Sequence, residues 1–194
     1  MKTKDFCIIS ILLCLCLLSC RSGPQGKKAS QADAFNARGS DNQTVQRLIL
    51  DYAGMKEYDT VSWAWIDPAF KLEDYGAVSL QPILNFSTIE YPQAQKQIET
   101  ALTDALAARK TTAERGKPLA VTAAITGMQG KPGLIKRFSP SYEDMPSIEL
   151  EIIIAEAESK RVLAKICHMA RAEDLPRAMD QLLQDVTAFL NKTM

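Results

Sequence analysis

The side-chain alternation in the last third of the chain constrains the fold most strongly. Within residues 147–157, apolar side chains occupy every second position, and the positions between them are polar in the first half. Successive side chains of a strand point to opposite faces, so this segment predicts a strand with one apolar face. A second strand, 162–171, follows the short connection Glu158-Ser159-Lys160-Arg161. The pair therefore predicts an antiparallel hairpin.

Two segments have the period of an amphipathic helix. One begins at Tyr91-Pro92 and extends to about Arg109, and the other follows Asp174, which is a residue type favoured as an N-cap. The second helix has the stronger apolar stripe, formed by Leu175, Met179, Leu182, Leu183, Val186 and Leu190. Each helix therefore buries one side only.

Further strand candidates lie between these elements. Residues 119–128 alternate apolar and polar positions, and residues 75–84 do so up to Pro82, which predicts an edge or a bulge there. Residues 44–54 fit a short amphipathic helix or turn that ends at Gly54. We therefore expect the segment before Tyr75 to wrap an edge or end of the sheet.

These elements together predict one α+β domain in two layers. A mixed, mainly antiparallel sheet of about four strands, with two helices on one face, satisfies every apolar stripe. The predicted domain spans residues 43–194.

The N-terminus has the composition of an export signal. Lys2 and Lys4 precede an apolar run of 13 residues, Phe6–Leu18. A helix that spans a bilayer needs roughly 20 apolar residues, so this run is too short to span but suits a signal peptide.

The end of this run, Leu17-Leu18-Ser19-Cys20, resembles the lipobox of bacterial lipoproteins. The resemblance implies removal of signal peptide 1–19 and attachment of lipid (palmitate among the acyl chains) to Cys20. Two or more acyl chains anchor a protein stably. Arg21, in place of an aspartate, implies by the same resemblance an outer-membrane location on the periplasmic face.

Residues 20–42 are mainly small and polar, which predicts a flexible tether with an r.m.s. reach of roughly 25 Å. Without Lys2, Lys4 and Asp5, the 23 basic and 23 acidic residues leave a formal charge of −1. This balance gives no electrostatic reason to expect a nucleic-acid partner. The expected contacts are the membrane, through the lipid, and another periplasmic protein or peptidoglycan.

Cys167 is the only cysteine after Cys20, so no disulfide is possible within the mature domain. We expect its thiol to be buried. Its neighbour His168 is the only histidine, and adjacent residues of a strand point to opposite faces. A catalytic Cys–His pair or a metal centre is therefore not expected at this position, and no cofactor is implied.

Trp63 and Trp65 share one face of an extended segment that Asp67 and Pro68 end. Two indoles on one face form either a platform for a sugar or aromatic ligand, with Asp67 beside it, or a packing contact with the core. Core packing is the commoner use of such a pair.

Glu149 and Glu151 share a strand face about 7 Å apart, a separation also found between the two carboxylates of glycosidases. The interpretation adopted here is a solvated outer face. The glycine-rich segment 127–133 lacks the Ser or Thr of a phosphate-binding loop, so we interpret 127–146 as a mobile connection whose Lys131, Lys136 and Arg137 are exposed.

Several short motifs resemble a bacterial lipoprotein family known only as a domain of unknown function, DUF3313. They are Leu50-Asp51-Tyr52 with Met55, Trp65-Ile66-Asp67-Pro68, Tyr75 with Val78 and Pro82, Ala124-Ile125-Thr126, and the late hairpin. This resemblance implies no catalytic residue. The sequence thus predicts a non-enzymatic lipoprotein. The alternative is a hydrolase or small-ligand-binding protein that uses the Trp63 and Trp65 surface.

Overall fold

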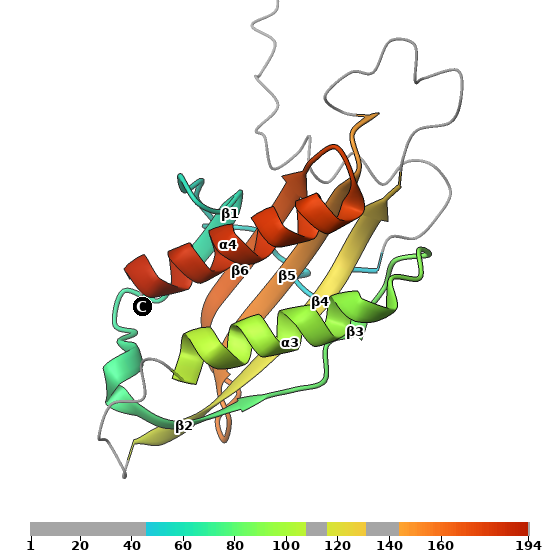
Figure 1. Cartoon of the computed structure of the whole chain (residues 1–194). Helices are drawn as coiled ribbons and strands as arrows, with labels where there is room; N and C mark the ends of the chain where they lie inside the picture. Colours follow the sequence, from blue (N-terminus) through green and yellow to red (C-terminus); the bar gives the residue numbers. More distant parts are fainter. Residues whose placement is uncertain (1–45, 108–115, 131–143, 194) are drawn as a thin grey trace, which may run out of the picture. The chain divides into compact units, whose positions relative to one another are not determined.

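The computed structural model describes residues 46–107, 116–130 and 144–193 (Figure 1). These residues belong to one compact unit, Thr44–Met194. The predicted signal peptide, the lipid attachment site at Cys20, the tether and the basic residues Lys131, Lys136 and Arg137 lie outside the described residues. None of the described helices combines the length and the apolar character that crossing a bilayer requires.

The described part of the chain contains one sheet of six strands, two more than the sequence predicted. The strand order is β1-β6-β5-β4-β2, and β3 also pairs with β4. The elements are β1 (Trp63–Ile66), a short 3-10 helix (Leu72–Asp74), β2 (Tyr75–Leu80), β3 (Leu84–Asn85), α3 (Pro92–Ala107), β4 (Lys117–Gln129), β5 (Ser147–Glu156), β6 (Val162–Arg171) and α4 (Leu175–Thr193).

The sheet is mixed and mainly antiparallel, as predicted. Strands β4, β5, β6 and β1 pair antiparallel, whereas β2 and β3 run parallel to β4. The predicted strand 75–84 is interrupted near Pro82, because a proline has no N–H for the ladder. Two short edge strands therefore replace one long strand.

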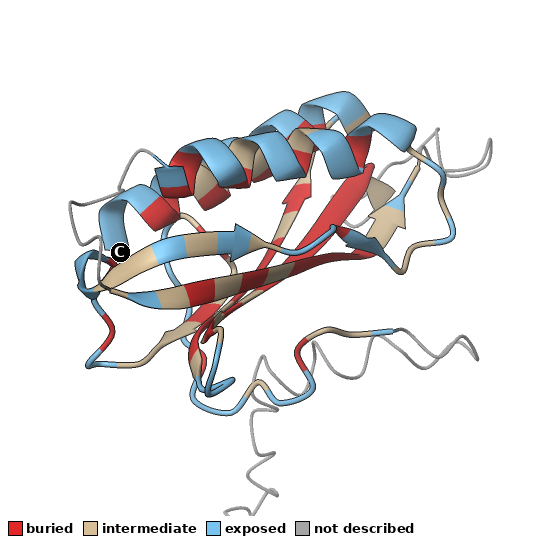
Figure 2. Ribbon diagram, turned by 90° about the horizontal axis from the view of Figure 1, so that it is seen from below, coloured by how far each residue is buried: buried red, intermediate tan, exposed pale blue. Residues whose placement is uncertain are grey.

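Helices α3 and α4 lie side by side over one face of the sheet, which confirms the predicted two layers (Figures 1 and 2). The core lies between these layers, where the apolar side of β5 meets α4 residues that are almost completely buried. We call the side of the sheet that the two helices cover the helix face, and the opposite side the open face. The backbone N–H of Arg177 donates to Asp174 Oδ1 over 2.9 Å, so the predicted N-cap is confirmed.

The hairpin of β5 and β6 is confirmed as well. Ile152 pairs with Ile166 in the antiparallel ladder, and the connection contains Lys160 with a φ of 60°. The ladder places Glu151 opposite Cys167 on the open face. This pairing determines which residues of the two strands meet there.

Residues 46–56 form a segment that we call the strap. It lies against the open face, on the side of the sheet away from the helices (Figure 2). The strap is irregular, with a turn at Ala53-Gly54, so the predicted helical alternative for 44–54 is wrong over its described part. It ends at Lys56, which forms two 2.8 Å backbone hydrogen bonds with Ala64 of β1. Residues 46–56 thus cover a face of the sheet, whereas the sequence predicted that the segment before Tyr75 wraps an edge or end. Strand β1, in the same segment, does lie at an edge of the sheet.

Candidate functional site: an acidic clamp beneath the strap

Glu149 and Glu151 project from β5 into the open face, and the strap covers them. Their exposed fractions are 4% and 0%. The interpretation of this pair as a solvated outer face is therefore wrong. Two buried carboxylates need ionic or hydrogen-bonding partners, because burial of an uncompensated charge is very costly. We call these two side chains the acidic clamp.

Every hydrogen bond that Glu151 accepts within the described residues comes from the strap. Its Oε2 accepts the backbone N–H groups of Leu48 at 2.7 Å and Ile49 at 2.8 Å. Its Oε1 accepts the Nη1 of Arg47 at 3.0 Å and the phenol of Tyr52. One carboxylate therefore fixes both the direction and the register of the strap.

Arg47 bridges the two glutamates. Its Nη1 lies 2.6 Å from Glu149 Oε1 and 3.4 Å from Thr126 Oγ1 on β4, in addition to its contact with Glu151. Burial, the largest single effect, lowers the pKa of Arg47, but the charge of Glu149 and the hydrogen bonds to Glu149 and Glu151 raise it by more in total, so the pKa is raised. The guanidinium is therefore firmly charged and compensates the acidic clamp.

Cys167 completes the site from β6. Its thiol is fully buried, as predicted, and donates to Glu149 Oε1 over 3.7 Å. Burial, followed by the nearby charges of Glu149 and Glu151, raises the pKa of Cys167 well above its usual value. Burial and the bond to Glu151 likewise raise the pKa of Tyr52. Both groups are thus held in their protonated forms.

The donor atoms of Glu149, Glu151 and Cys167 lie within 4.8 Å of one another, a grouping that could hold a metal ion. In this arrangement, the cation at the cluster is the guanidinium of Arg47. The contacts therefore identify the cluster as the site on the sheet that binds the strap.

A local feature of β4 makes room for the clamp. The ladder between β4 and β5 is irregular between Ile125 and Gly127, and Gly127 pairs with Glu149. A side-chain carbon at Gly127 would lie only 3.1 Å from Glu149 Oε2. The sequence predicted a mobile connection from Gly127 onward, but residues 127–129 belong to β4.

Trp63 and Trp65 share the open face, as their spacing predicted, and both are half-buried. Trp65 lies beneath the strap, because a side-chain carbon at Gly54 would be 3.4 Å from its ring. Lys165 Nζ lies 5.9 Å from the centroid of the same indole and donates to the carbonyl of Asp51 over 2.9 Å. Asp67 instead accepts the N–H of Ala69 in a turn. Trp65 thus borders the strap, and Trp63 lies beside it on β1 on the same face of the sheet.

The single histidine points to the helix face, opposite Cys167, as predicted. His168 Nδ1 lies 3.2 Å from Ser62 Oγ, and His168 Nε2 lies 3.0 Å from Asp185 Oδ2 of α4. The sequence reasoning missed this Ser–His–Asp arrangement. However, the backbone N–H of Ser62 also donates to Nδ1 over 3.1 Å, and Ser62 Oγ accepts the N–H of Met169. The imidazole therefore links Ser62, the residue before β1, with β6 and α4, and does not present an uncommitted base to the serine.

This contact predicts a pH-dependent stability. Burial lowers the pKa of His168 below 6.5, although Asp185 opposes the shift. The unfolded chain therefore binds the proton more readily, and stability decreases as the pH falls below about 6.5. The single imidazole resonance in NMR spectra should titrate below that value. His168→Gln should remove this part of the pH dependence of urea unfolding, and an unchanged profile would contradict the assignment.

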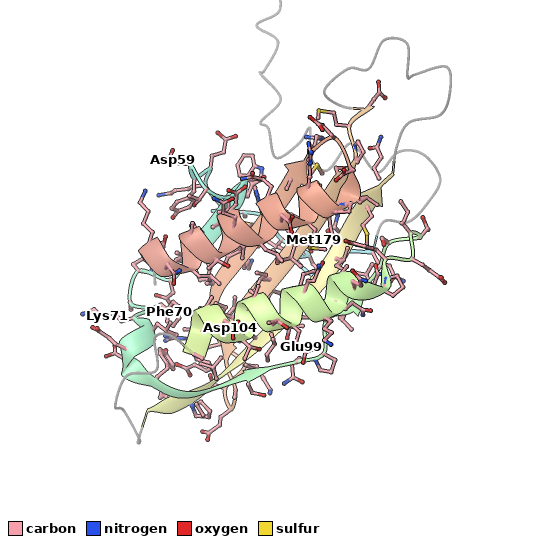
Figure 3. The ribbon with its side chains drawn as sticks, in the orientation of Figure 1. Asp59, Phe70, Lys71, Glu99, Asp104 and Met179 are labelled. Carbon is pink, nitrogen blue, oxygen red and sulfur yellow. The ribbon has the colours of Figure 1, made fainter. Side chains whose placement is uncertain are left out.

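A shallow groove lies between the outer sides of α3 and α4. Its volume is about 570 Å³. Figure 3 marks Asp104 on α3 and Met179 on α4, the two helices that border the groove. It is lined by Gln93, Lys96, Gln97, Thr100, Ala101, Asp104 and Leu183. No predicted site residue contributes to it.

No family model matches this sequence, and no curated protein matches it. The chain is similar to a solved point variant of the PelC dodecamer from Paraburkholderia phytofirmans, with a TM-score of 0.44 and 12% identity over 67% of this chain and 96% of that chain. It is also similar to the lipoprotein GNA1162 from Neisseria meningitidis, with a TM-score of 0.42 and 6% identity over 61% and 99%.

A third similar structure is XCC0632 from Xanthomonas campestris, described as DUF330, with a TM-score of 0.38 and 11% identity over 66% and 85%. Bacterial lipoproteins are thus among the structures that the chain resembles. At these low scores the similarities assign neither a family nor a site. The resemblance to DUF3313 continues to rest on the short sequence motifs alone.

Proposed function

We propose that this protein is an outer-membrane lipoprotein, anchored by lipid on Cys20, whose domain lies on the periplasmic face and binds another envelope component without catalysis. The observation that carries the anchor is the order of sequence features: a basic start, a short apolar run and Leu17-Leu18-Ser19-Cys20. The resemblance of this motif to a lipobox supports lipid attachment. The polar composition of residues 21–42 suits a linker to the domain.

The absence of catalysis is inferred from how the reactive groups are used in the described residues. Glu149 and Glu151 bind the strap, Cys167 is a buried thiol, and His168 of β6 contacts Ser62 and Asp185 of α4. Each group thus has a structural partner from the chain itself. Another periplasmic protein or peptidoglycan is the proposed partner, and the near-neutral charge gives no support for nucleic acid.

Metabolic labelling with palmitate tests the anchor. We expect the protein to incorporate label and Cys20→Ala to lose it completely, because the thiol is the attachment atom. Cys16→Ala is the matched control and should retain the label. Label that persists in Cys20→Ala, or an unlabelled natural chain, would contradict the proposal.

Separation of inner and outer membranes by density then tests the location.

Recovery of a partner tests the binding role. The tagged lipoprotein, purified from detergent-solubilised envelopes, should enrich a reproducible protein or peptidoglycan relative to an unrelated lipoprotein. Equal recovery from both would count against a binding module.

The alternative function, a small-ligand-binding protein or hydrolase, rests on the half-buried Trp63 and Trp65, of which Trp65 borders the strap. If these indoles form a ligand platform, Trp63→Ala should abolish binding or activity while the far-UV circular dichroism is unchanged. Glu151→Gln is unsuited to this test, because Glu151 holds the strap.

A further inference from the structure

The strap contacts the sheet in the manner of a bound peptide. Ile49 and Met55 are buried to 1% and 8% exposure, whereas Leu50 between them is 91% exposed. The strap has no described helix or strand of its own, and its backbone reaches the sheet mainly through Glu151. Anchoring of a short irregular segment through its backbone N–H groups, with two apolar side chains buried, is comparable to the way a domain holds a bound peptide.

The rest of the domain is fastened independently of the strap. The ring of Tyr58 packs edge-on against Phe189 of α4, with centroids 5.0 Å apart, and its backbone N–H donates to Val61 over 3.2 Å. These contacts hold the chain immediately after the strap. Departure of residues 46–56 would therefore leave the helix face and the sheet ladder in place while it uncovers the acidic clamp.

The exposed clamp would present a defined set of acceptors. Glu151 offers one oxygen to two consecutive backbone N–H groups, and the other to an arginine and a phenol. Glu149 offers a second carboxylate to the same arginine. This set selects a short peptide with an arginine followed by two residues other than proline, because proline has no N–H to donate.

We infer that the acidic clamp is a binding site for a short arginine-containing peptide, and that the strap occupies this site as an autoinhibitory ligand. The inference rests on the proposed binding function but is independent of the lipid anchor. A tethered segment has an effective concentration in the millimolar range. A partner in trans must therefore compete with the strap, and weakening the strap should expose the site.

The test uses the full chain and a synthetic peptide of residues 46–56, Gln-Arg-Leu-Ile-Leu-Asp-Tyr-Ala-Gly-Met-Lys, with a C-terminal fluorophore. Arg47→Ala/Tyr52→Phe weakens the strap and leaves every sheet residue unchanged. Fluorescence anisotropy should show the peptide binding this variant at least tenfold more tightly than the natural chain. Adding Glu151→Gln to the variant should remove the gain, as should alanine in place of arginine within the peptide.

A second readout localises the binding. Cys167 lies in the tryptic peptide Ile166–Arg171, so mass spectrometry reports its alkylation separately from that of every other cysteine. Bound peptide should slow alkylation of Cys167 in the weakened variant. If that variant does not fold, Leu48→Pro replaces it, since this change removes one N–H donor to Glu151 and alters only the strap.

Equal peptide binding by the natural and weakened chains, binding that does not need the arginine, or no binding to either folded variant would overturn the inference. These results are distinguishable from failure of the proposed function. Recovery of an envelope partner by a chain that does not bind the peptide would retain a binding module and reject the clamp as its site.

Discussion

Glu151→Ala should lower the free energy of unfolding by about 3–5 kcal/mol, the usual cost of removing one member of a buried ion pair. The change leaves Arg47 without one of its carboxylates and deprives the N–H groups of Leu48 and Ile49 of their acceptor. A difference of 1 kcal/mol shifts the Tm of a domain of this size by about 2–4 °C. Urea unfolding and a thermal scan both measure the loss.

Glu99→Ala provides the matched control for that experiment. Glu99 is an exposed residue of α3, far from the strap along the sequence, and its replacement should change stability by no more than about 0.5 kcal/mol (Figure 3). If Glu151→Ala is equally mild, Glu151 is solvated and the clamp does not exist as described.

Arg47→Ala should increase the rate of Cys167 alkylation by about 100-fold. A reagent reaches the fully buried thiol only when the strap opens, so the rate follows the free energy of local opening. If the free energy of strap opening falls by about 3 kcal/mol, the equilibrium constant for opening rises roughly 100-fold. Mass spectrometry of the tryptic peptide follows the time course.

Lys165→Ala is the control for the alkylation experiment. Lys165 contacts the strap through Asp51, at the exposed border, so its loss should accelerate alkylation much less than Arg47→Ala does. Both variants should react at the same rate in urea, where no strap protects the thiol. Rapid alkylation of the natural chain would mean that the strap does not cover Cys167.

The two-layer architecture was predictable from local patterns. The alternation in 147–157 and 162–171 specifies a hairpin, and the apolar stripe after Asp174 specifies a one-sided helix. These signals are local, so one sequence is sufficient to detect them. The strands β1 and β3 are short, and β3 follows Pro82, which explains why the sequence predicted about four strands where the described residues contain six.

The acidic clamp was not predictable from strand alternation alone. Glutamates at alternate positions of β5 give the same pattern whether water or another segment covers their face. The contacts that bury Glu151 come from residues about 100 positions earlier, as the separation of 102 between Ile49 and Glu151 illustrates. One sequence signal for the covered face was available. Ile153 lies on the same face of β5 as the glutamates, and an isoleucine there indicates that another segment covers part of that face.

The Ser62, His168 and Asp185 contacts were missed for the same reason. Along the sequence only Cys167 is adjacent to His168, and the strand alternation predicts correctly that the two side chains point apart. The true neighbours of His168 lie 106 positions before it and 17 positions after it, on other elements. Only the packing of α4 on the sheet brings these three side chains together.

Hydrogen exchange of the Leu48 and Ile49 amides tests most directly whether the strap is held by the acidic clamp. Both N–H groups donate to Glu151 Oε2, so both should exchange far more slowly than amides of an unstructured peptide, and Glu151→Gln should accelerate both. Exchange of these two amides at the rate of an unstructured peptide in the natural chain would contradict the clamp.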